Sequence, residues 1–295
     1  MTTQTKHDEA GRTTAILESM EAFQQSLLDS AEISSDHIID QIDRWRTQLI
    51  DATTEEQKRF NEEKESFITY VAHELRTPMT SIRGYGDMLL KGVTGPLTSA
   101  QTDFVKTIVR NVERMQILIS DLQDITRIET DQLQLESKPT YLTKAVENAL
   151  ETMEDHIEER GQVLKVDVPD NLPPILGSPA RLEQVFTELL RNASKYTPED
   201  GQIHVRLWQE DDRIHASVSD NGYGISSEDQ AKLFTKFFRS ENPAIREKSG
   251  TGLGLCVTKT LVERHGGAFE IESQLGEGTQ VTLTFPIHPV EEDAD

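Results

Sequence analysis

The sequence has little cysteine, little positive charge and no long apolar run. Its 295 residues contain one cysteine, Cys256, which excludes an intrachain disulfide framework and a multi-cysteine metal site and fits a reducing compartment. Lysine and arginine number 30 against 52 aspartates and glutamates, a formal net charge of −22. This balance argues against a sequence-independent nucleic-acid binder and against docking on an anionic membrane, because both need clustered cations.

No stretch approaches the ~20 apolar residues of a membrane helix, and the N-terminus lacks a basic-then-apolar leader. We therefore expect a cytoplasmic protein with no membrane segment in this chain. The length suggests about two domains of roughly 150 residues each. A hydrophobic content of 35% is enough for packed domains.

An apolar spacing of three and four residues runs from Ile16 to Ala52. It resembles the a/d seam of a coiled coil over about five heptads and contains no proline. A continuous or near-continuous parallel coil is the favoured interpretation, and separate amphipathic helices in a small bundle are the alternative. Polar residues between Asp29 and Ser35 would allow a break in the middle.

Residues 54–65 predict a solvated connecting helix, and two apolar helices separated by a turn over 92–98 follow it. The stripe of the first is Ile68, Val71, Leu75, Ile82 and Leu89. The stripe of the second is Phe104, Ile108, Met115, Leu118, Leu122, Ile125 and Ile128. Pro78 should kink the first helix. One such hairpin exposes too wide an apolar face, so two should pair as a four-helix bundle in a homodimer.

Beyond residues 131–140 the pattern alternates between helices and strands. Helices are predicted near 142–153, 181–196 and 252–265, and strands near 163–168, 203–208, 214–219, 268–273 and 280–285. This order predicts an α+β domain whose mixed sheet is covered by helices on one face. The acidic tail over residues 291–295 is expected to be disordered.

The segment Val71-Ala-His73-Glu74-Leu-Arg-Thr77-Pro78 lies on the first hairpin helix. His73 follows Val71 by two positions, so it points about 200° away and should be exposed. Thr77 lies one turn later on the same face. The adjacent Glu74 can accept a ring N–H and leave the other nitrogen nucleophilic. Taken alone, an exposed histidine is more often an ordinary surface residue.

Four polar residues share one face of the predicted helix over residues 181–196, and its opposite face is apolar. They are Glu188, Asn192, Lys195 and Tyr196. A carboxylate, an amide oxygen and an ammonium can together hold a hard cation and phosphate oxygens. An ordinary solvated helix face is the alternative.

Two glycine-containing loops complete the set of motifs. Asp220–Ile225 ends a strand, and its carboxylate could accept a hydrogen bond from an exocyclic amine. Lys248–Leu255 precedes a helix, where free N–H groups can bind an anion. The second loop is neither a Rossmann fingerprint nor a P-loop. Each loop by itself could be an ordinary turn.

These motifs occur in one order, and in that order the sequence resembles the sensor histidine kinases over roughly residues 60–287. Residues 72–78 resemble the phosphoacceptor box of that family, and residues 184–198 its asparagine box. The later matches are 220–225 and 250–255 to the two glycine boxes, 233–239 to the phenylalanine box, and 276–279 to a Gly-x-Gly-Thr element near the adenine.

The resemblance implies an all-α coiled coil and dimeric four-helix bundle, followed by an α+β ATP-binding domain of the Bergerat fold. The expected domains are a helical signalling segment over 1–60, a dimerisation and phosphotransfer domain over 61–134, a catalytic domain over 135–288 and an acidic tail over 289–295.

The same resemblance implies that His73 attacks the γ-phosphate of ATP and that Glu74 acts as general base. Thr77 would orient the water that removes phosphate from the partner. Asn192 and Glu188 would ligate Mg²⁺, although the family often has asparagine where Glu188 stands, which makes the metal geometry there less certain.

In the nucleotide pocket, Lys195 would add charge to the phosphates, Tyr196 would lie against the nucleotide and Asp220 would bind the adenine amino group. The other expected nucleotide-site residues are Gly222, Gly224, Lys236, Arg239, Gly250, Gly252, Gly254, Leu255 and Thr279. The lid, Ser240–Ser249, is expected to be disordered without nucleotide.

The implied function is an ATP-dependent protein-histidine kinase of a two-component system. It would act as a homodimer and pass the phosphoryl group from His73 to an aspartate in the receiver domain of a response regulator. Two alternatives stay open: a nucleotide-binding scaffold without phosphoryl transfer, and a gyrase-like ATPase. The second is disfavoured because such an enzyme does not need the histidine-bearing hairpin.

Overall fold

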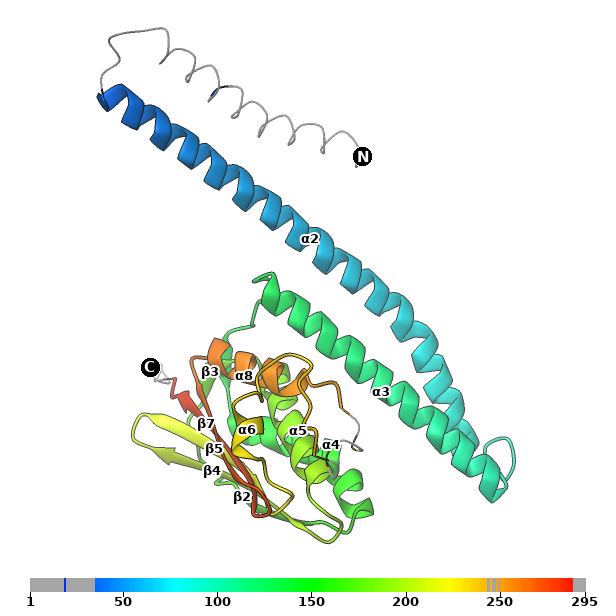
Figure 1. Ribbon diagram of the computed structural model, residues 1–295. Coiled ribbons are helices and arrows are strands. Elements are labelled where there is room, and N and C mark those ends of the chain that lie inside the picture. The colour runs from blue at the N-terminus through cyan, green and yellow to red at the C-terminus, as the bar shows by residue number, and fades with distance from the viewer. Residues whose placement is uncertain (1–18, 20–34, 243–244, 246–247, 249, 289–295) are drawn as a thin grey trace, which may run out of the picture. The chain divides into compact units, whose positions relative to one another are not determined.

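The computed structural model describes residues 19, 35–242, 245, 248 and 250–288 (Figure 1). The part of the predicted coiled-coil seam before residue 35, except residue 19, lies outside the described residues. The acidic tail over residues 289–295 lies outside them as well. The chain divides into two compact units, Met1–Val71 and Ala72–Asp295. Across the described part of the chain, no helix is long and apolar enough to cross a bilayer.

Helix α2 spans Ser35–Leu90 without interruption. It unites the predicted connecting helix over 54–65 with the helix that carries His73. Proline inside a helix costs about 3 kcal/mol relative to alanine, yet α2 continues through Pro78. Burial of Ala72, six residues before the proline, and of Met79, directly after it, helps to offset this cost.

Helix α3 spans Ser99–Glu129 and begins at a capping box. The Thr98 Oγ1 accepts a hydrogen bond from the Gln101 backbone N–H at 3.3 Å, and the Gln101 Oε1 accepts one from the Thr98 N–H at 2.9 Å. These two bonds satisfy N–H groups that the helix itself leaves without acceptors. Helices α2 and α3 follow one another with a short turn between them, which confirms the predicted αα-hairpin.

The two hairpin helices meet along small and medium-sized side chains. Ala72, Met79 and Gly86 recur every seven residues of α2 and are buried. The predicted stripe residues Leu75 and Ile82 instead stay 44% exposed, because two packed helices cover only one side of each other. The stripe of α3 is likewise largely exposed, at Phe104, Ile108, Met115, Leu118 and Leu122.

The α+β domain contains a mixed five-stranded sheet in the order β2-β4-β5-β7-β6. The strands are β2 Val163–Asp167, β4 Gln202–Glu210, β5 Arg213–Asp220, β6 Ala268–Gln274 and β7 Gly278–Pro286. β2 pairs parallel with β4, and the other pairs are antiparallel. Alternate residues of β4, Ile203, Val205 and Leu207, are buried because a strand turns every second side chain to the same face.

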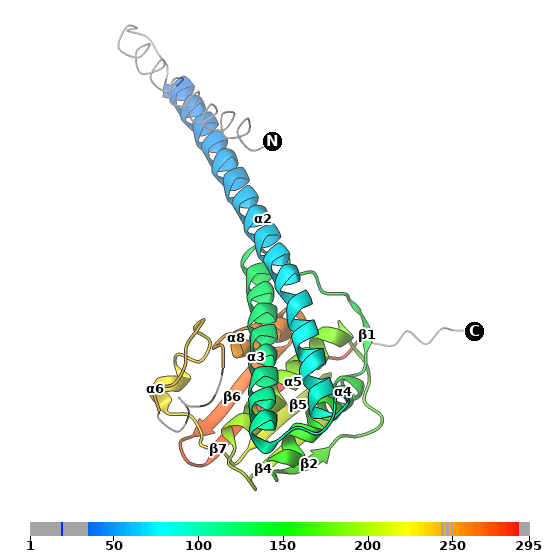
Figure 2. The same cartoon turned by 90° about the vertical axis from the view of Figure 1, so that its right-hand side faces the viewer.

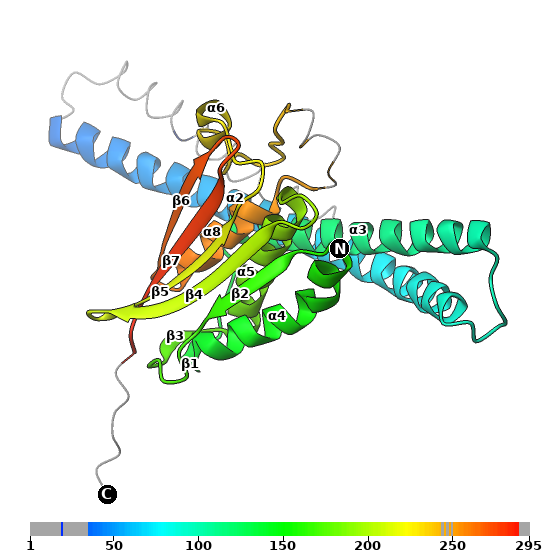
Figure 3. The same cartoon turned by 90° about the horizontal axis from the view of Figure 1, so that it is seen from below.

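Three helices cover that face of the sheet (Figure 3): α4 Leu142–Glu159, α5 Pro179–Tyr196 and α8 Gly254–Arg264. A short helix, α6, spans Ser227–Gln230. The predicted α+β architecture is confirmed. The sequence did not predict a second sheet, in which β1 Lys138–Thr140 pairs with β3 Ile175–Gly177, because three-residue strands show no readable alternation.

At Gly86 helix α2 lies directly against a side chain of α3. A Cβ at this position would lie 2.4 Å from Val109 Cγ2, whereas a Cβ at Gly84 would meet nothing within 4 Å. Gly86→Leu should lower the free energy of unfolding by about 1–3 kcal/mol through overpacking. Gly84→Leu is the matched control and should be neutral or stabilising. Thermal unfolding followed by circular dichroism measures both, and equal melting temperatures would contradict this packing.

Candidate functional site

One cavity of the α+β domain collects most of the residues that the sequence singled out. It lies between α5, the end of β5, the start of β7 and the glycine-rich segment before α8. The predicted residues that line it are Glu188, Asn192, Lys195, Tyr196, Asp220, Gly224, Arg239, Gly250, Gly252, Gly254, Leu255 and Thr279. Apolar side chains that the sequence analysis did not select complete the lining, at Leu189, Val218, Ile225, Ile271 and Val281.

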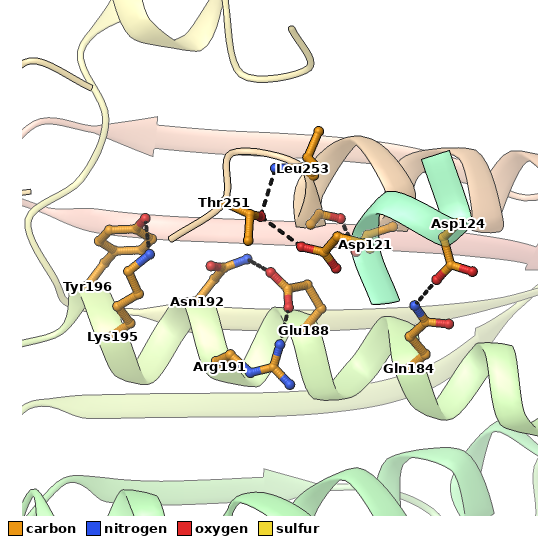
Figure 4. Close-up of polar contacts among 12 residues, drawn as sticks. Asp121, Asp124, Gln184, Glu188, Arg191, Asn192, Lys195, Tyr196, Thr251 and Leu253 are labelled. Carbon is orange, nitrogen blue, oxygen red and sulfur yellow. Dashed lines mark hydrogen bonds and ion pairs between the residues drawn. The ribbon is translucent and has the colours of Figure 1, made fainter. Parts of the chain in front are cut away.

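Helix α5 positions the polar wall of the cavity. Its apolar residues Val185 and Leu189 are at most 2% exposed, so the opposite face of the helix turns to the cavity. On that face Glu188 accepts hydrogen bonds from Arg191 Nη1 at 2.6 Å and from Asn192 Nδ2 at 3.1 Å (Figure 4). Burial raises the pKa of the Glu188 carboxyl, and the neighbouring Arg191 cation opposes this shift.

Lys195 and Tyr196 continue this wall by one turn. The Lys195 Nζ donates a hydrogen bond to the Tyr196 hydroxyl at 2.6 Å (Figure 4). Burial lowers the pKa of the lysine ammonium to about 8, while the Glu188 carboxylate partly restores it. A lysine held in this way carries its charge at neutral pH and loses it in mild alkali.

Asp220 closes the other side of the cavity at the end of β5. Its Oδ1 accepts a hydrogen bond from the Gly222 N–H at 2.8 Å. Burial raises the pKa of the carboxyl to about 6, against the opposing effect of hydrogen bonds from the Gly222 and Thr279 backbones. Gly222 does not line the cavity itself but holds the aspartate. The carboxylate therefore offers an acceptor in an otherwise apolar recess.

The glycine-rich segment lies so close to α5 that it leaves no room for a Cβ atom at two of its glycines. A Cβ at Gly250 would lie 2.7 Å from Lys195 Nζ, and one at Gly254 would lie 2.2 Å from Glu188 Oε1. Thr251 Oγ1 accepts a hydrogen bond from the Leu253 N–H at 3.0 Å and so orders the start of α8 (Figure 4). Backbone N–H groups at such a helix start can bind an anion. Five lid residues, 243, 244, 246, 247 and 249, lie outside the described residues.

His73, Glu74 and Thr77 do not line this cavity. The His73 side chain is 76% exposed, as predicted, and its Nδ1 lies 3.7 Å from Glu74 Oε1. Thr77 is exposed as well. Three residues after His73, Arg76 Nη2 donates a hydrogen bond to Gln123 Oε1 at 2.9 Å and ties α2 to α3. The histidine is thus held on a braced helix and is open to solvent.

Besides Gly222, a second predicted nucleotide-site residue, Lys236, does not line the cavity. Its ammonium pairs with Glu129 at the end of α3. The structure also brings in residues that sequence analysis did not select, namely Thr251 of the glycine segment and Asp121 of α3, whose Oδ2 accepts a hydrogen bond from Thr251 Oγ1 at 2.7 Å. The two are 130 positions apart, so no local pattern in the sequence could pair them.

Gly224 is a further close approach, in a left-handed conformation with φ of +64°. A Cβ there would lie 1.9 Å from the Gln274 carbonyl oxygen, whereas a Cβ at Gly276, with φ of +85°, would meet nothing within 4 Å. Gly276→Ala should therefore cost only the backbone strain, about 1 kcal/mol, and Gly224→Ala clearly more. Urea unfolding of both variants measures the difference. Equal losses of stability would contradict the contact.

Comparison with known proteins follows the same division of the chain. Residues 63–131 match the His Kinase A (phospho-acceptor) domain, and residues 177–289 match the histidine kinase-, DNA gyrase B-, and HSP90-like ATPase domain. The circadian input-output histidine kinase CikA of Synechococcus elongatus is 38% identical over 253 residues, which cover 83% of this chain and 33% of that protein.

Sensor histidine kinase WalK of Bacillus subtilis is 30% identical over 240 residues, 81% of this chain and 39% of WalK. Full-length ShkA, solved in complex with AMPPNP, superposes with a TM-score of 0.60 at 25% identity, over 76% of this chain and 46% of that one. The chain thus spans about a third of the length of the curated relatives it matches. With a phospho-acceptor domain followed by this ATPase domain, the chain belongs to the sensor histidine kinases.

Proposed function

We propose that this chain is an ATP-dependent protein-histidine kinase that phosphorylates His73 and passes the phosphoryl group to an aspartate of a response-regulator receiver domain. The observation that carries this proposal is the solvent-exposed His73 imidazole on a braced helix, in a chain that also holds a cavity with an anion-binding helix start. Most of the barrier to phosphoryl transfer is overcome by positioning and charge neutralisation, which such a cavity can supply.

The His73 ring supplies the nucleophile. Its Nδ1 is the nitrogen nearer to Glu74, so Nε2 is free to attack the γ-phosphorus. The bond from that phosphorus to the bridging oxygen breaks and ADP leaves. The Glu74 carboxylate, whose Oε1 lies 3.7 Å from Nδ1, moves closer and accepts a hydrogen bond from the proton on Nδ1. This keeps the lone pair of Nε2 available for the attack. Thr77 is our candidate for orienting the water that dephosphorylates the receiver, which a Thr77→Ala dephosphorylation assay tests.

The cavity residues bind the nucleotide. Asp220 accepts a hydrogen bond from the adenine amino group, and Tyr196 lies against the base or sugar. Lys195, Arg239 and the backbone around Gly250, Gly252 and Gly254 neutralise the phosphates. Leu255 and Thr279 contribute to the walls. Gly222 keeps Asp220 in place.

A magnesium ion fits these residues. Mg²⁺ keeps several waters and usually takes one or two protein ligands together with phosphate oxygens. The Asn192 amide and the Glu188 carboxylate offer two oxygen ligands one helical turn apart. Among the described residues no group of three or more His, Cys, Asp or Glu side chains could hold a metal ion, which fits a site with few protein ligands. When bound, the ion would neutralise charge on the transferred group. Glu188 would then exchange its hydrogen bond from Asn192 for the ion.

The apolar stripes left exposed on α2 and α3 support a homodimer. Leu75, Ile82 and Leu122 are each about 40% exposed, and they lie on a hairpin whose own contacts use other residues. Pairing two hairpins would bury these side chains in a four-helix bundle.

The phosphorylation site is tested with radiolabelled ATP. The protein should gain an acid-labile, alkali-stable label, and His73→Ala should lose it because the variant lacks the imidazole that accepts the phosphoryl group. His156→Ala removes a different exposed histidine and should keep the label. Nucleotide binding without any label would favour the scaffold alternative. A label that persists in His73→Ala would reject His73 as the acceptor.

Nucleotide affinity should be greatest between about pH 6 and pH 8. Below about pH 6 Asp220 gains a proton and accepts the adenine hydrogen bond less well, and above about pH 8 Lys195 loses its positive charge. Calorimetric titration with ADP from pH 5 to pH 9 measures both limbs. Asp220→Asn should weaken binding about tenfold or more and flatten the acid limb, while Lys195→Gln should flatten the alkaline limb. Unchanged limbs would remove these residues from the site.

A further inference from the structure

A buried glutamine lies between the end of α5 and the start of the sheet. Gln162 is in the turn between α4 and β2 and directly precedes β2, and α4 packs alongside α5 (Figure 2). The residue is only 7% exposed. Burial of a polar side chain costs free energy unless its hydrogen bonds are satisfied, so the partners of this amide show what it holds in place.

The Gln162 amide bonds to the last turn of α5 and to the residues just after it. Its Nε2 donates to the carbonyl oxygen of Ser194 at 2.9 Å and to those of Thr197 and Pro198, both at 3.1 Å. Its Oε1 accepts a hydrogen bond from the Ser194 hydroxyl at 2.6 Å. The orientation of the amide is therefore fixed, because an oxygen in place of Nε2 would face three acceptors.

Pro198 explains why the end of α5 needs this amide. In a continuing helix the Ser194 carbonyl would accept a hydrogen bond from the N–H four residues later, but that residue is Pro198, which has no N–H. Gln162 supplies the missing donor. Arg160 adds another, because its Nη2 donates to the Thr197 carbonyl oxygen at 2.9 Å. Side chains from the turn between α4 and β2 thus fix the end of α5.

The end of α5 in turn contacts the loop that begins at Asp220. The Tyr223 N–H donates a hydrogen bond to the Tyr196 carbonyl oxygen at 3.1 Å. A Cβ at Gly222 would lie 2.3 Å from that carbonyl oxygen and 2.7 Å from Asp220 Oδ1. Because the loop leaves so little room, a shift of the Tyr196 carbonyl would displace Gly222, whose N–H donates to Asp220 at 2.8 Å.

We propose that Gln162 is a positioning residue that sets the preference of the cavity for adenine, by holding the end of α5 against the loop that carries Asp220. This inference deepens the proposed function and rests on it, because Asp220 is the residue assigned there to the adenine amino group. Gln162 and Ser194 do not line the cavity, so they act on a nucleotide only through the end of α5.

The test compares the affinities of ADP and inosine diphosphate, which carries a carbonyl oxygen where adenine carries its amino group. The Asp220 carboxylate accepts a hydrogen bond from the amino group and repels the carbonyl oxygen, so the unaltered protein should prefer ADP. Competition against a fluorescent ADP analogue, with Mg²⁺ and the full chain, measures both affinities. Gln162→Met keeps the length of the side chain but removes its hydrogen bonds, and it should lower the preference for ADP about fivefold or more.

Two further variants accompany Gln162→Met. Ser194→Ala removes only the hydroxyl that donates to Gln162 Oε1 and favours the helix, so it should fold and lower the preference by about twofold. Gln209→Met is the matched control, because Gln209 Nε2 donates to the Asp211 carbonyl oxygen at 3.1 Å in the exposed turn between β4 and β5. It should leave the preference unchanged. Circular dichroism measures whether each variant is folded.

The preference is a ratio of two affinities, so a general loss of stability, which weakens binding of both nucleotides alike, does not change it. A lower ratio in Gln162→Met, with Gln209→Met unchanged, supports the positioning role. An unchanged ratio in Gln162→Met, or an equal fall in Gln209→Met, overturns it. Ser194→Ala decides in the same way if Gln162→Met does not fold.

Failure of the proposed function has a different signature, which the unaltered protein shows by itself. If it binds neither nucleotide, the nucleotide site is rejected. If it binds both equally, the assignment of Asp220 to the adenine amino group is rejected, and the role of Gln162 is rejected with it.

Discussion

The rest of the site depends on the packing of α5, which lays one face on the sheet and turns the other to the cavity. Its apolar residues, with Leu182 and Val185 fully buried, fix the rotation of the helix on the sheet. Once that rotation is fixed, a period of 3.6 residues turns Glu188, Asn192 and Lys195 to the cavity. The glycine segment before α8 can then approach them because it has no Cβ atoms in the way. A different rotation of α5 would move the carboxylate, the amide and the ammonium together.

Burial within this constraint changes the chemistry of charged groups. Because the protein carries a net charge of −22, binding of an anionic nucleotide needs local cations and N–H donors that offset the repulsion. In the proposed site Lys195 and the start of α8 would provide these, while Glu188 and Asp220 stay in the cavity at the cost of raised pKa values. Such costs are typical of groups kept for binding or catalysis rather than for stability.

Sequence reasoning reached most of the site because its parts lie on periodic or glycine-rich segments. The side chains of α5 follow from helical spacing, and the exposure of His73 follows from its offset of two from Val71. Lys236 shows the limit. Its motif suggested a nucleotide contact, but the ion pair with Glu129 depends on where the end of α3 lies, which no local pattern encodes. The β1–β3 pair escaped for a similar reason, since pairing of three-residue strands is decided by the surrounding fold.

Local spacing was enough to predict most of the helices and strands, the polar face of α5, the exposed histidine and the glycine-rich start of α8. These depend on spacing along one chain segment, and spacing is fully present in the sequence. Packing of α2 against α3 selects Ala72, Met79 and Gly86 for the hairpin contact and leaves Leu75 and Ile82 exposed. The tertiary structure alone placed Asp121 on Thr251 and Asp124 on Arg181, because contacts between distant residues depend on how packed elements come together.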